Sequence, residues 1–510
     1  MERNFGAIAD LVRLHAQHTP GNAALADAHH TLDYRALDAL MDRIAASLQR
    51  DGLKPGDAIA ICASSSVNYA AVFLGALRAG VAVAPLAPGS TPASLTRMIE
   101  DAEARILFSD ASAAEVIGPA TEGGITRVAL DGSAVGRGLE DWLAPAGTQP
   151  APVEAQPSWA FNIIYSSGTT GEPKGIVQGH GMRWAHVQRG AKYEYSPDTV
   201  TLLSTPLYSN TTLVVFFPTI AFGGCVVLMP KFDALGYLQL ASQRRVTHTM
   251  LVPVQYQRLM AHPRFDEHDL SAFRHKFSTS APFSAALKAD VLKRWPGGLV
   301  EFYGMTEGGG TCILEAHLNP AKLHTVGRPA EGSDIRLIDE QGNELPRGNT
   351  EVAGEVVGHS AGMMTGYHRQ PEKTREAEWF DATGKRFIRT GDVGRFDAEG
   401  FLTLFDRKKD MIISGGFNIY PSDLEAVLRG HAAVADAAVV GVPSQQWGET
   451  PVAFVVRREG DATTEAALLQ WTNDQLGKTQ RLARLSFIDE LPRSAIGKVL
   501  KRELRERDHG

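Results

Sequence analysis

The stretch AIAICASSSVNYAAVFLGALRAGVAVAPL, which runs from Ala58 to Leu86, gives the clearest sign of the fold class. Its two ends, AIAICA and VAVAPL, are short and almost purely apolar, as strands buried on both faces are. The segment between them, Val67–Ala79, is long enough to form a helix. A strand, a helix and a second strand in this order predict a parallel sheet whose faces are covered by helices. The expected fold class is therefore α/β.

The same alternation continues along the chain. TPASLTRMIEDAEA (91–104) predicts a helix with a proline near its start, and RILFS (105–109) predicts a strand. The alternation resumes after Ser158. We therefore expect one large N-terminal domain of mainly parallel sheets with helices on their faces.

Two changes of pattern divide the rest of the chain. Between about residues 326 and 404, short strand-like runs alternate with Gly- and Pro-bearing turns such as DEQGNELPRG, which predicts a small β subdomain. A charged stretch, Asp406–Asp410, follows, and beyond it a helix pattern at Pro421–Leu428 precedes further strands and a helix. We expect an N-terminal domain of residues 1–406 and a smaller, mobile α+β domain of residues 407–510.

Size and composition are those of a globular protein with more than one domain. The chain has 510 residues, of which 44% are apolar and 21% charged. The net charge of -7 gives no basic footprint, so no nucleic-acid partner is expected. Cys62, Cys225 and Cys312 form neither a metal spacing nor a disulfide framework, and the first residues lack a signal-peptide pattern. The expected location is therefore a reducing, cytoplasmic one.

One nearly uncharged segment, TTLVVFFPTIAFGGCVVLMP (Thr211–Pro230), is about long enough to cross a bilayer. Pro218 and the Gly223–Gly224 pair interrupt it, and both residue types break regular structure. We interpret the segment as a buried helix, a turn and a buried strand through Cys225–Met229. No membrane span is expected.

The stretch IIYSSGTTGEPKG, Ile163–Gly175, has the composition of a phosphate-binding loop. Glycines let the backbone approach an anion, hydroxyls donate hydrogen bonds, and Lys174 adds positive charge. The loop is not a Walker A motif, because the final GK[ST] is missing, and it is not a GxGxxG dinucleotide motif. An ordinary Ser/Thr/Gly-rich surface loop has the same composition, so the phosphate hypothesis depends on the surrounding sequence.

Five motifs, in order, give the chain a family resemblance. The loop from Tyr165 to Gly175 resembles the signature of the adenylate-forming superfamily of acyl-CoA synthetases, peptide-synthetase adenylation domains and firefly-type luciferases. Four further stretches resemble the other motifs of that family: TSAPFS (279–284), EFYGMTEGGG (301–310), RTGDVGRFDAEGFLTLFDRKKDMIISGGFNIYPSDLE (389–425) and LPRSAIGKVLKREL (491–504). The resemblance covers essentially the whole chain. It implies that a carboxylate attacks the α-phosphate of ATP, giving an acyl-adenylate and pyrophosphate, and that a thiol then displaces AMP.

The resemblance implies a set of contacts to ATP and Mg²⁺. Thr306 would contact the α-phosphate, and Tyr303 would stack near the adenine. Glu307 would help to hold Mg²⁺, a hard cation that prefers oxygen ligands, although a helix-capping or surface carboxylate is the alternative. The other expected contacts are the loop residues Ser166, Ser167, Gly168, Thr169, Thr170 (also a magnesium ligand), Gly171 and Lys174, the adenine segment Ser280, Ala281 and Pro282 with Gly304, and Asp392 and Arg407 on the ribose side.

The resemblance also assigns roles in the C-terminal motifs. Lys498 would bridge the attacking carboxylate and the α-phosphate, where a flexible cation offsets the repulsion between two anions. Lys409 matches the hinge about which the C-terminal domain rotates between the two steps. In the second orientation Gly415 and Gly416 would line a thiol tunnel, unless they only form a turn. Trp447 would touch the adenine of coenzyme A.

The resemblance places the acid substrate beside Tyr208, Ser209, Gly308 and Gly309. The segment PLYSNTT has Ser209 where many relatives have a histidine, so Tyr208 is the candidate aromatic gate. It also lacks the Asp that peptide-synthetase domains use for an α-ammonium group. No arginine stands in LVVFF or GGGTCIL, which argues against a dicarboxylate. The leading hypothesis is a CoA ligase for an aromatic or medium-chain monocarboxylic acid, with ATP, Mg²⁺ and coenzyme A as cofactors.

Three alternatives remain open at this point. An acyl-AMP ligase that loads an acyl-carrier protein is the first, because GKTQRLARLSF (477–487) lacks the aromatic-Lys-x-Pro run of many CoA-using relatives. A homologue that only binds nucleotide is the second, and the intact motif residues argue against it. A luciferase-like oxidative function is the third. Homodimers are common in the family, so a homodimer is compatible with the resemblance.

Overall fold

The computed structural model describes residues 4–118, 125–167, 173–348, 350–407, 410–414, 417–444, 447–477, 480–494 and 497–508. The chain forms two compact units. The N-terminal unit comprises Met1–Asp334 and Gly358–Ile388, and the C-terminal unit comprises Ile335–Val357 and Arg389–Gly510. The boundary between residues 406 and 407 that the sequence suggests stays a prediction.

Within the described part of the N-terminal unit, an eight-stranded sheet contains the two strands of the opening stretch. These strands pair in parallel, as predicted, with Ile59 opposite Val83. Six strands of this sheet, β8, β4, β3, β5, β6 and β7, are parallel to one another. At one edge β9 pairs antiparallel with β8, and β19 pairs antiparallel with β9. The spatial order is β19 (Gly366–Tyr367), β9 (Pro173–Gly179), β8 (Ala160–Ser167), β4 (Ala82–Leu86), β3 (Ala58–Cys62), β5 (Ala104–Ser109), β6 (Thr126–Ala129) and β7 (Arg137–Gly138).

A nine-stranded sheet forms the second layer of strands in the described part of this unit. Its central strands are parallel, and β2, β15 and β16 at the two edges are antiparallel to their neighbours. The spatial order is β16 (Arg328–Pro329), β15 (Cys312–Glu315), β14 (Gly298–Tyr303), β13 (His275–Ser278), β12 (His248–Leu251), β10 (Val200–Leu203), β11 (Cys225–Leu228), β1 (Ala23–Ala26) and β2 (Thr31–Asp33).

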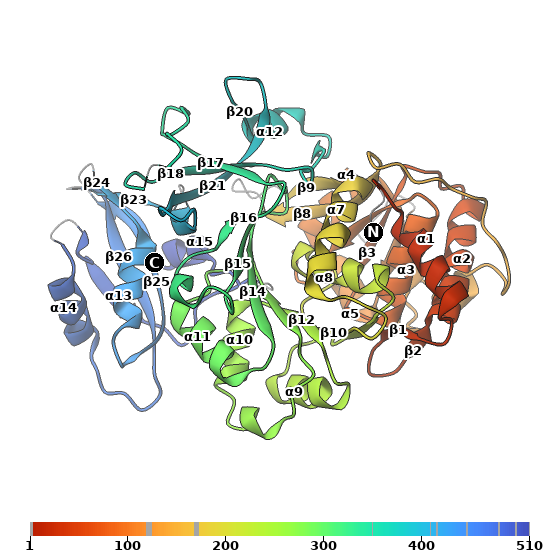
Figure 1. The fold of residues 1–510 in the computed structure, drawn as a ribbon, viewed down its shortest axis with the longest axis horizontal. Coiled ribbons are helices and arrows are strands. Elements are labelled where there is room, and N and C mark those ends of the chain that lie inside the picture. The colour runs from red at the N-terminus through yellow and green to blue at the C-terminus, as the bar shows by residue number, and fades with distance from the viewer. Residues whose placement is uncertain are drawn as a thin grey trace. The chain divides into compact units, whose positions relative to one another are not determined.

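Helices connect and cover these two sheets (Figure 1). This arrangement follows from the parallel pairing, because parallel neighbours need crossover connections. The helices of the unit are α1 (Ile8–His18), α2 (Tyr34–Arg50), α3 (Val67–Arg78), α4 (Pro92–Asp101), α5 (Ala111–Ile117), α6 (Leu139–Trp142), α7 (His180–Gly190), α8 (Asn210–Ala221), α9 (Ala234–Gln243), α10 (Pro253–Met260), α11 (Ala285–Arg294) and α12 (Pro371–Glu376).

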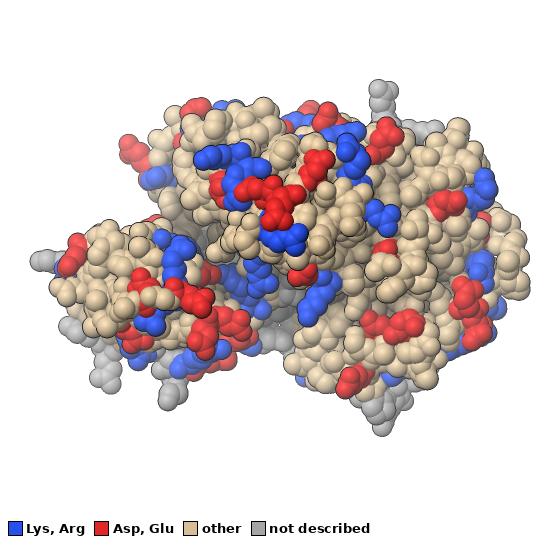
Figure 2. All heavy atoms as spheres, turned by 90° about the horizontal axis from the view of Figure 1, so that it is seen from below, with Lys and Arg blue, Asp and Glu red and all other residues tan. Residues whose placement is uncertain are grey.

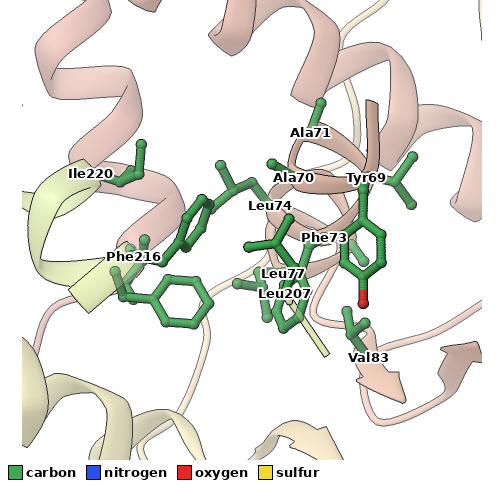
Figure 3. Packing of buried hydrophobic residues seen from close by; sticks show 14 of the residues in the cluster. Tyr69, Ala70, Ala71, Phe73, Leu74, Leu77, Val83, Leu207, Phe216 and Ile220 are labelled. Atoms are coloured by element: carbon green, nitrogen blue, oxygen red, sulfur yellow. The ribbon is translucent and has the colours of Figure 1, made fainter. Parts of the chain in front are cut away.

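Helix α3 lies at the centre of the largest apolar core. Ser66 caps its first turn by accepting a hydrogen bond from the backbone N–H of Tyr69 at 3.2 Å. Almost every residue of the helix is buried, which agrees with a sequence that is apolar on all sides. The side chains of α3 and α8 meet in this core (Figure 3), where the rings of Phe73 and Phe217 lie 5.6 Å apart.

The apolar segment 211–230 forms a helix, a turn and a strand, as predicted. Helix α8 contains Pro218 and continues to Ala221, so the proline does not divide the segment. The division comes at Gly223, whose φ of +83° suits glycine, and β11 follows. Among the described residues, none of the helices has both the length and the apolar character needed to cross a bilayer.

The C-terminal unit contains two small groups of strands. In the first group β17 (Asp334–Ile338) pairs with β18 (Gly354–His359), which pairs with β21 (Arg386–Phe396), and β22 (Leu402–Arg407) also pairs with β21. β21 starts in the N-terminal unit, where its first residues pair with β20 (Glu378–Phe380). The second group has the order β24 (Phe417–Ile419), β23 (Ile412–Ser414), β26 (Gly448–Arg457) and β25 (Val434–Ser444), with β27 (Arg484–Phe487) beside β26. The helices in the described part of this unit are α13 (Pro421–Arg429), α14 (Glu465–Gln475) and α15 (Lys501–Asp508).

Charge is mixed on the face of the molecule that Figure 2 shows. Figure 2 shows Lys and Arg side chains interspersed with Asp and Glu side chains on the face in view.

The three cysteines are free thiols, with Cys62 and Cys312 buried and Cys225 partly buried. None of them forms a disulfide, in agreement with the sequence prediction.

Gly75 in α3 allows helix α2 to pack closely. A Cβ at this position would lie 2.6 Å from Cγ2 of Ile44. We expect Gly75→Ala to lower the free energy of unfolding by about 1–3 kcal/mol, because overpacking of the core outweighs the helix propensity gained. Chemical denaturation measures the effect. Gly21→Ala is the control, since a Cβ there meets nothing within 4 Å; equal stability of the two variants would contradict the prediction.

Candidate functional site

A β-hairpin presents the expected phosphate loop. β8 and β9 pair antiparallel, with Ser166 directly opposite Lys174. Tyr165 anchors the base of the hairpin by donating a hydrogen bond from its hydroxyl to Oδ2 of Asp101 at 2.6 Å. Burial, with Asp101 as the second cause, raises the pKa of Tyr165, so the phenol stays protonated. Gly168, Thr169, Thr170, Gly171 and the side chain of Ser167 lie outside the described residues.

Tyr367 connects two of the predicted site residues. Nζ of Lys174 lies 4.9 Å from the centre of the Tyr367 ring, which is a cation–π contact. The Tyr367 hydroxyl donates a hydrogen bond to Oε1 of Glu307 at 2.9 Å. Burial and then the Glu307 charge raise the pKa of Tyr367, so it remains a donor at neutral pH. The lysine expected to bind phosphate and the carboxylate expected to bind metal are therefore oriented by one aromatic side chain.

The carboxylate of Glu307 fits a magnesium ion in ligand type. Mg²⁺ prefers oxygen ligands and usually takes one or two carboxylates together with substrate phosphates. Within the described ranges, no group of three or more His, Cys, Asp or Glu side chains could hold a metal by itself. A magnesium ion at Glu307 would therefore depend on oxygen atoms of a bound nucleotide.

The turn that carries Glu307 is fixed by backbone contacts. Met364 donates its N–H to the Glu307 carbonyl at 2.8 Å, and Gly308 donates to the Met305 carbonyl at 2.9 Å. Gly308 and Gly309 have φ values of +75° and +81°. A Cβ on Gly308 would lie 2.0 Å from the Gly362 carbonyl oxygen. Packing alone therefore requires glycine at these positions, and their contact with an acid substrate stays a prediction.

The carbonyl of Thr306 is held by a buried amide cluster, which we define as Asn162, Gln178, Arg183 and Asn210. Nε2 of Gln178 donates to the Thr306 carbonyl at 2.7 Å. Asn162 and Arg183 both donate to Oε1 of Gln178, which fixes the orientation of that amide. Asn210 accepts from NH1 of Arg183 at 2.9 Å. The cluster therefore connects the Thr306 turn to the start of α8.

The first turn of α8 contacts the expected adenine segment. Ser209 caps the helix by accepting from the Thr211 N–H at 3.3 Å. The hydroxyls of Thr211 and Ser280 are 2.5 Å apart. Ser280 has a φ of +82°, an uncommon conformation for a residue with a side chain, so this contact helps to hold a strained backbone. Tyr208, just before the cap, is partly buried, and burial raises the pKa of its hydroxyl.

The other nucleotide-side residues lie at strand ends. Tyr303 ends β14, opposite Cys312, and Gly304 follows it. Glu301 of the same strand forms a buried ion pair with Lys288 of α11, and burial raises the pKa of Glu301. After Ala281 and Pro282, Phe283 stacks on Tyr256 at 5.1 Å. These contacts fix both ends of the expected adenine site within the N-terminal unit.

In the C-terminal unit the structure brings the two ribose-side residues together. Asp392 on β21 is the direct cross-strand partner of Arg407 on β22. The N–H of Asp392 donates to Thr390 Oγ1 at 3.0 Å, and that hydroxyl donates to the Val356 carbonyl at 2.8 Å. The Asp392 backbone is therefore fixed through two strands. The side chain of Arg407 lies outside the described residues.

Lys498 stands in a short turn with fixed ends. Arg493 and Val499 form an antiparallel bridge, and NH1 of Arg493 donates to the Gly497 carbonyl at 2.6 Å. Gly497 has a φ of +77°. Arg493 also forms an ion pair with Asp436 on β25. The turn therefore holds the Lys498 backbone, while the residue itself is exposed.

The expected thiol-side residues are only partly described. Lys409, Gly415 and Gly416 lie outside the described residues. Trp447 is described and is 51% exposed, as is its near neighbour Ile413 at 52%. Ser414 of β23 pairs with Gly448, the first residue of β26, so Trp447 lies in the turn just before that strand. An exposed tryptophan of this kind is available to stack on a flat ring.

Sequence reasoning missed Tyr367 and the amide cluster apart from Asn210. Tyr367 lies 60 residues from Glu307 in the chain, within GYHRQPEKT, and no spacing rule connects them. Gln178 and Arg183 follow the phosphate loop closely, but nothing in IVQGHGMRW distinguishes them from surface polar residues. His180, Trp184 and Tyr256 are buried in the core.

Comparison with known proteins identifies relatives along the whole chain. The model of the AMP-binding enzyme family matches residues 12–368, and that of the AMP-binding enzyme C-terminal domain matches residues 423–498. The chain is 32% identical to a feruloyl-CoA synthase of Amycolatopsis sp, over 96% of this chain and 97% of the relative. It is 31% identical to the fatty acid–[acyl-carrier-protein] ligase ScoC of Streptomyces coeruleorubidus, over 97% and 95%. The crystal structure of ATP-bound MatB from Rhodopseudomonas palustris has a TM-score of 0.85 and 31% identity, covering 98% of each chain.

The hydrogen bond from Tyr367 to Glu307 generates a test. We expect Tyr367→Phe to keep the ring beneath Lys174 but to weaken magnesium-dependent ATP binding by about tenfold, the effect of losing one hydrogen bond to a charged group. Calorimetric titration of ATP with and without Mg²⁺ measures it. Tyr237→Phe, which loses a buried 2.7 Å hydrogen bond to Thr249, is the matched control. An unchanged magnesium dependence in Tyr367→Phe would rule out this role.

Proposed function

Because the chain belongs to the AMP-binding, adenylate-forming enzyme family, we propose that it is a carboxylic acid–CoA ligase for an aromatic or medium-chain monocarboxylic acid. The family activity is that of an AMP-forming acid–thiol ligase that uses ATP. The observation that best supports a working enzyme is the contact chain from Lys174 through Tyr367 to Glu307. A homologue that only bound nucleotide would use the same chain, so acid-dependent pyrophosphate release is the measurement that separates the two.

The first proposed step joins the acid to AMP. The loop 166–171 and Lys174 hold the β- and γ-phosphates, while Thr306 contacts the α-phosphate. A bound Mg²⁺ would neutralise charge on the phosphate oxygens, and Glu307 would hold it. One carboxylate oxygen of the acid bonds to the α-phosphorus as the bond to pyrophosphate breaks. No general base is needed, because the carboxylate is already ionised; the residues mainly position and neutralise charge.

Residues of the C-terminal unit complete this step in the proposal. Asp392 accepts hydrogen bonds from the ribose hydroxyls, with Arg407 beside it on the paired strand. Lys498 places its ammonium group between the carboxylate and the α-phosphate. In the second step the sulfur of coenzyme A bonds to the acyl carbon, AMP leaves, and the thiol proton goes to solvent. Gly415, Gly416 and Trp447 are proposed for that step, with Lys409 as the hinge.

The choice of acid and of acceptor is supported less directly. Tyr208 and Ser209, with Gly308 and Gly309, are proposed to line the acid site. The feruloyl-CoA synthase and the acyl-carrier-protein ligase are similarly close relatives, so relatives alone do not choose between CoA and a carrier protein. The exposed Trp447 favours CoA, because a tryptophan can stack on an adenine ring. Loading of an acyl-carrier protein is the alternative.

Separate assays of the two half-reactions distinguish a catalytic role of Lys498 in adenylation from a structural role. We expect Lys498→Ala to lower adenylate formation at least about 100-fold, as loss of a charged transition-state contact does, and to leave thiol transfer from preformed acyl-AMP largely intact. Pyrophosphate release and thioester formation measure the two steps. Arg502→Ala on α15 is the control, since Arg502 is exposed and pairs with the exposed Glu506 on the same helix. Equal loss of both half-reactions would refute the assignment.

The acceptor is tested with the purified enzyme. We expect acid-dependent pyrophosphate release with a panel of aromatic and medium-chain acids, and thioester formation with free CoA. The same assay contains a phosphopantetheinylated carrier protein in a parallel arm. Thioester on the carrier but not on CoA would favour the alternative, and the absence of adenylation with any acid would refute the proposed function.

A further inference from the structure

Helix α7 carries three basic residues on one side. Arg183, His186 and Arg189 are spaced three residues apart, so their side chains are neighbours along the helix. Arg183 reaches Asn210 at the start of α8, as described above. Arg189 donates from NH1 to Oγ1 of Thr311 at 3.5 Å, directly after the run Gly308–Gly310. The basic side of α7 therefore reaches the residues that follow both segments proposed to line the acid site, Asn210 after Ser209 and Thr311 after Gly310.

His186 is a neutral donor. An arginine can only donate, so the 3.4 Å contact between NH1 of Arg183 and Nδ1 of His186 makes that nitrogen an acceptor. The hydrogen of the neutral ring is then on Nε2. Burial, followed by the charges of Arg183 and Arg189, holds the pKa of His186 well below its ordinary value. Nε2–H makes no hydrogen bond with the residues that the structure describes.

Arg189 has more donors than acceptors around it. Its guanidinium carries five N–H groups, and in the described part of the chain the long bond to Thr311 is its only hydrogen bond. It is partly buried, and burial lowers its pKa. Neither Arg189 nor Arg183 forms an ion pair with a carboxylate among the described residues. A partly desolvated cation with one long hydrogen bond is costly, so the surroundings of Arg189 favour a ligand that supplies oxygen atoms.

We propose that His186 and Arg189 form a donor wall at the far end of the acid site, and that the preferred acid bears an oxygen acceptor remote from its reacting carboxylate. A ring hydroxyl, an ether, a ketone or a chain-end hydroxyl supplies such an acceptor. The proposal rests on the proposed function, since it concerns the substrate of that same site. Because this arginine comes from a third element, the lack of arginine in LVVFF and GGGTCIL no longer argues against a dicarboxylate, and a second carboxylate is one such acceptor.

Arg183 does not belong to this wall. Its side chain is fully buried and its N–H groups are satisfied by Asn162, Gln178, Asn210 and His186. Burial lowers the pKa of Arg183 to about 9, which leaves it charged at neutral pH. Its role is to fix the Nδ1 side of His186, so that Nε2–H is the group presented to a ligand.

Matched acids that differ by one oxygen test the proposal. The pairs are cinnamate with 4-hydroxycinnamate, and octanoate with 8-hydroxyoctanoate; ATP–pyrophosphate exchange gives kcat/KM for each. We expect the wild type to prefer at least one oxygen-bearing acid by about tenfold or more, as a site built for a hydrogen bond does. Arg189→Met and His186→Phe should each reduce that preference to within about threefold, because kcat/KM falls more for the oxygen-bearing acid than for the unsubstituted acid.

Conservative variants and a control make the result decisive. Arg189→Lys and His186→Gln keep a donor and should retain part of the preference, which loss of packing would not predict. Lys192→Met is the control, because Lys192 is exposed and pairs with Glu315 at 3.0 Å just beyond α7. No preference in the wild type, or a preference unchanged in both Arg189→Met and His186→Phe, overturns the proposal. Failure of the wild type to adenylate any acid would instead refute the proposed function.

Discussion

The antiparallel pairing of β8 with β9 is the constraint on which the site depends. Side chains two residues apart on a strand point to the same face, so Lys174, Ile176 and Gln178 of β9 share one face. Lys174 meets the ring of Tyr367, and Gln178 donates to the Thr306 carbonyl. Both ends of that face therefore act on the same Thr306–Glu307 turn. A shift of one residue in the pairing would turn all three side chains to the opposite face.

The interior behind this turn is polar, and among the described residues no carboxylate pairs with the arginine at its centre. Arg183 is surrounded by amide oxygens of Asn162, Gln178 and Asn210, and it lies near the rings of Phe161 and Phe217. A carboxylate partner would satisfy the arginine but would cancel its charge. Neutral acceptors satisfy the N–H groups and leave a positive potential near the site of an anionic reaction. The arrangement suits a reaction in which a carboxylate must approach a polyphosphate.

The sequence predicts the elements better than it predicts the contacts between them. β3, α3 and β4 follow from apolar runs that are buried on all sides. The motif residues Lys174 and Glu307 both contact Tyr367. Tyr367 could not be found in this way, because its place depends on the pairing of β19 with β9, a contact between distant parts of the chain. Arg183 resembles any surface arginine in sequence. Only the packing of α7 against β8, β9 and α8 buries it.

The proposed role of Lys498 requires it at the site in adenylation and away from the site in thiol transfer. Contacts at the ends of its turn make it costly to move the lysine by loosening that turn alone. Arg493 spans the turn to the Gly497 carbonyl and is paired with Asp436 on β25, and Asp436 also lies 3.5 Å from Arg429 of α13. Local unfolding of the turn would break these contacts together. A lysine that is needed for adenylation and absent during thiol transfer is therefore moved at lower cost with its whole unit than by loosening its own loop. The contacts at the ends of the turn thus favour domain rotation, which stays a proposal, as the means of alternation.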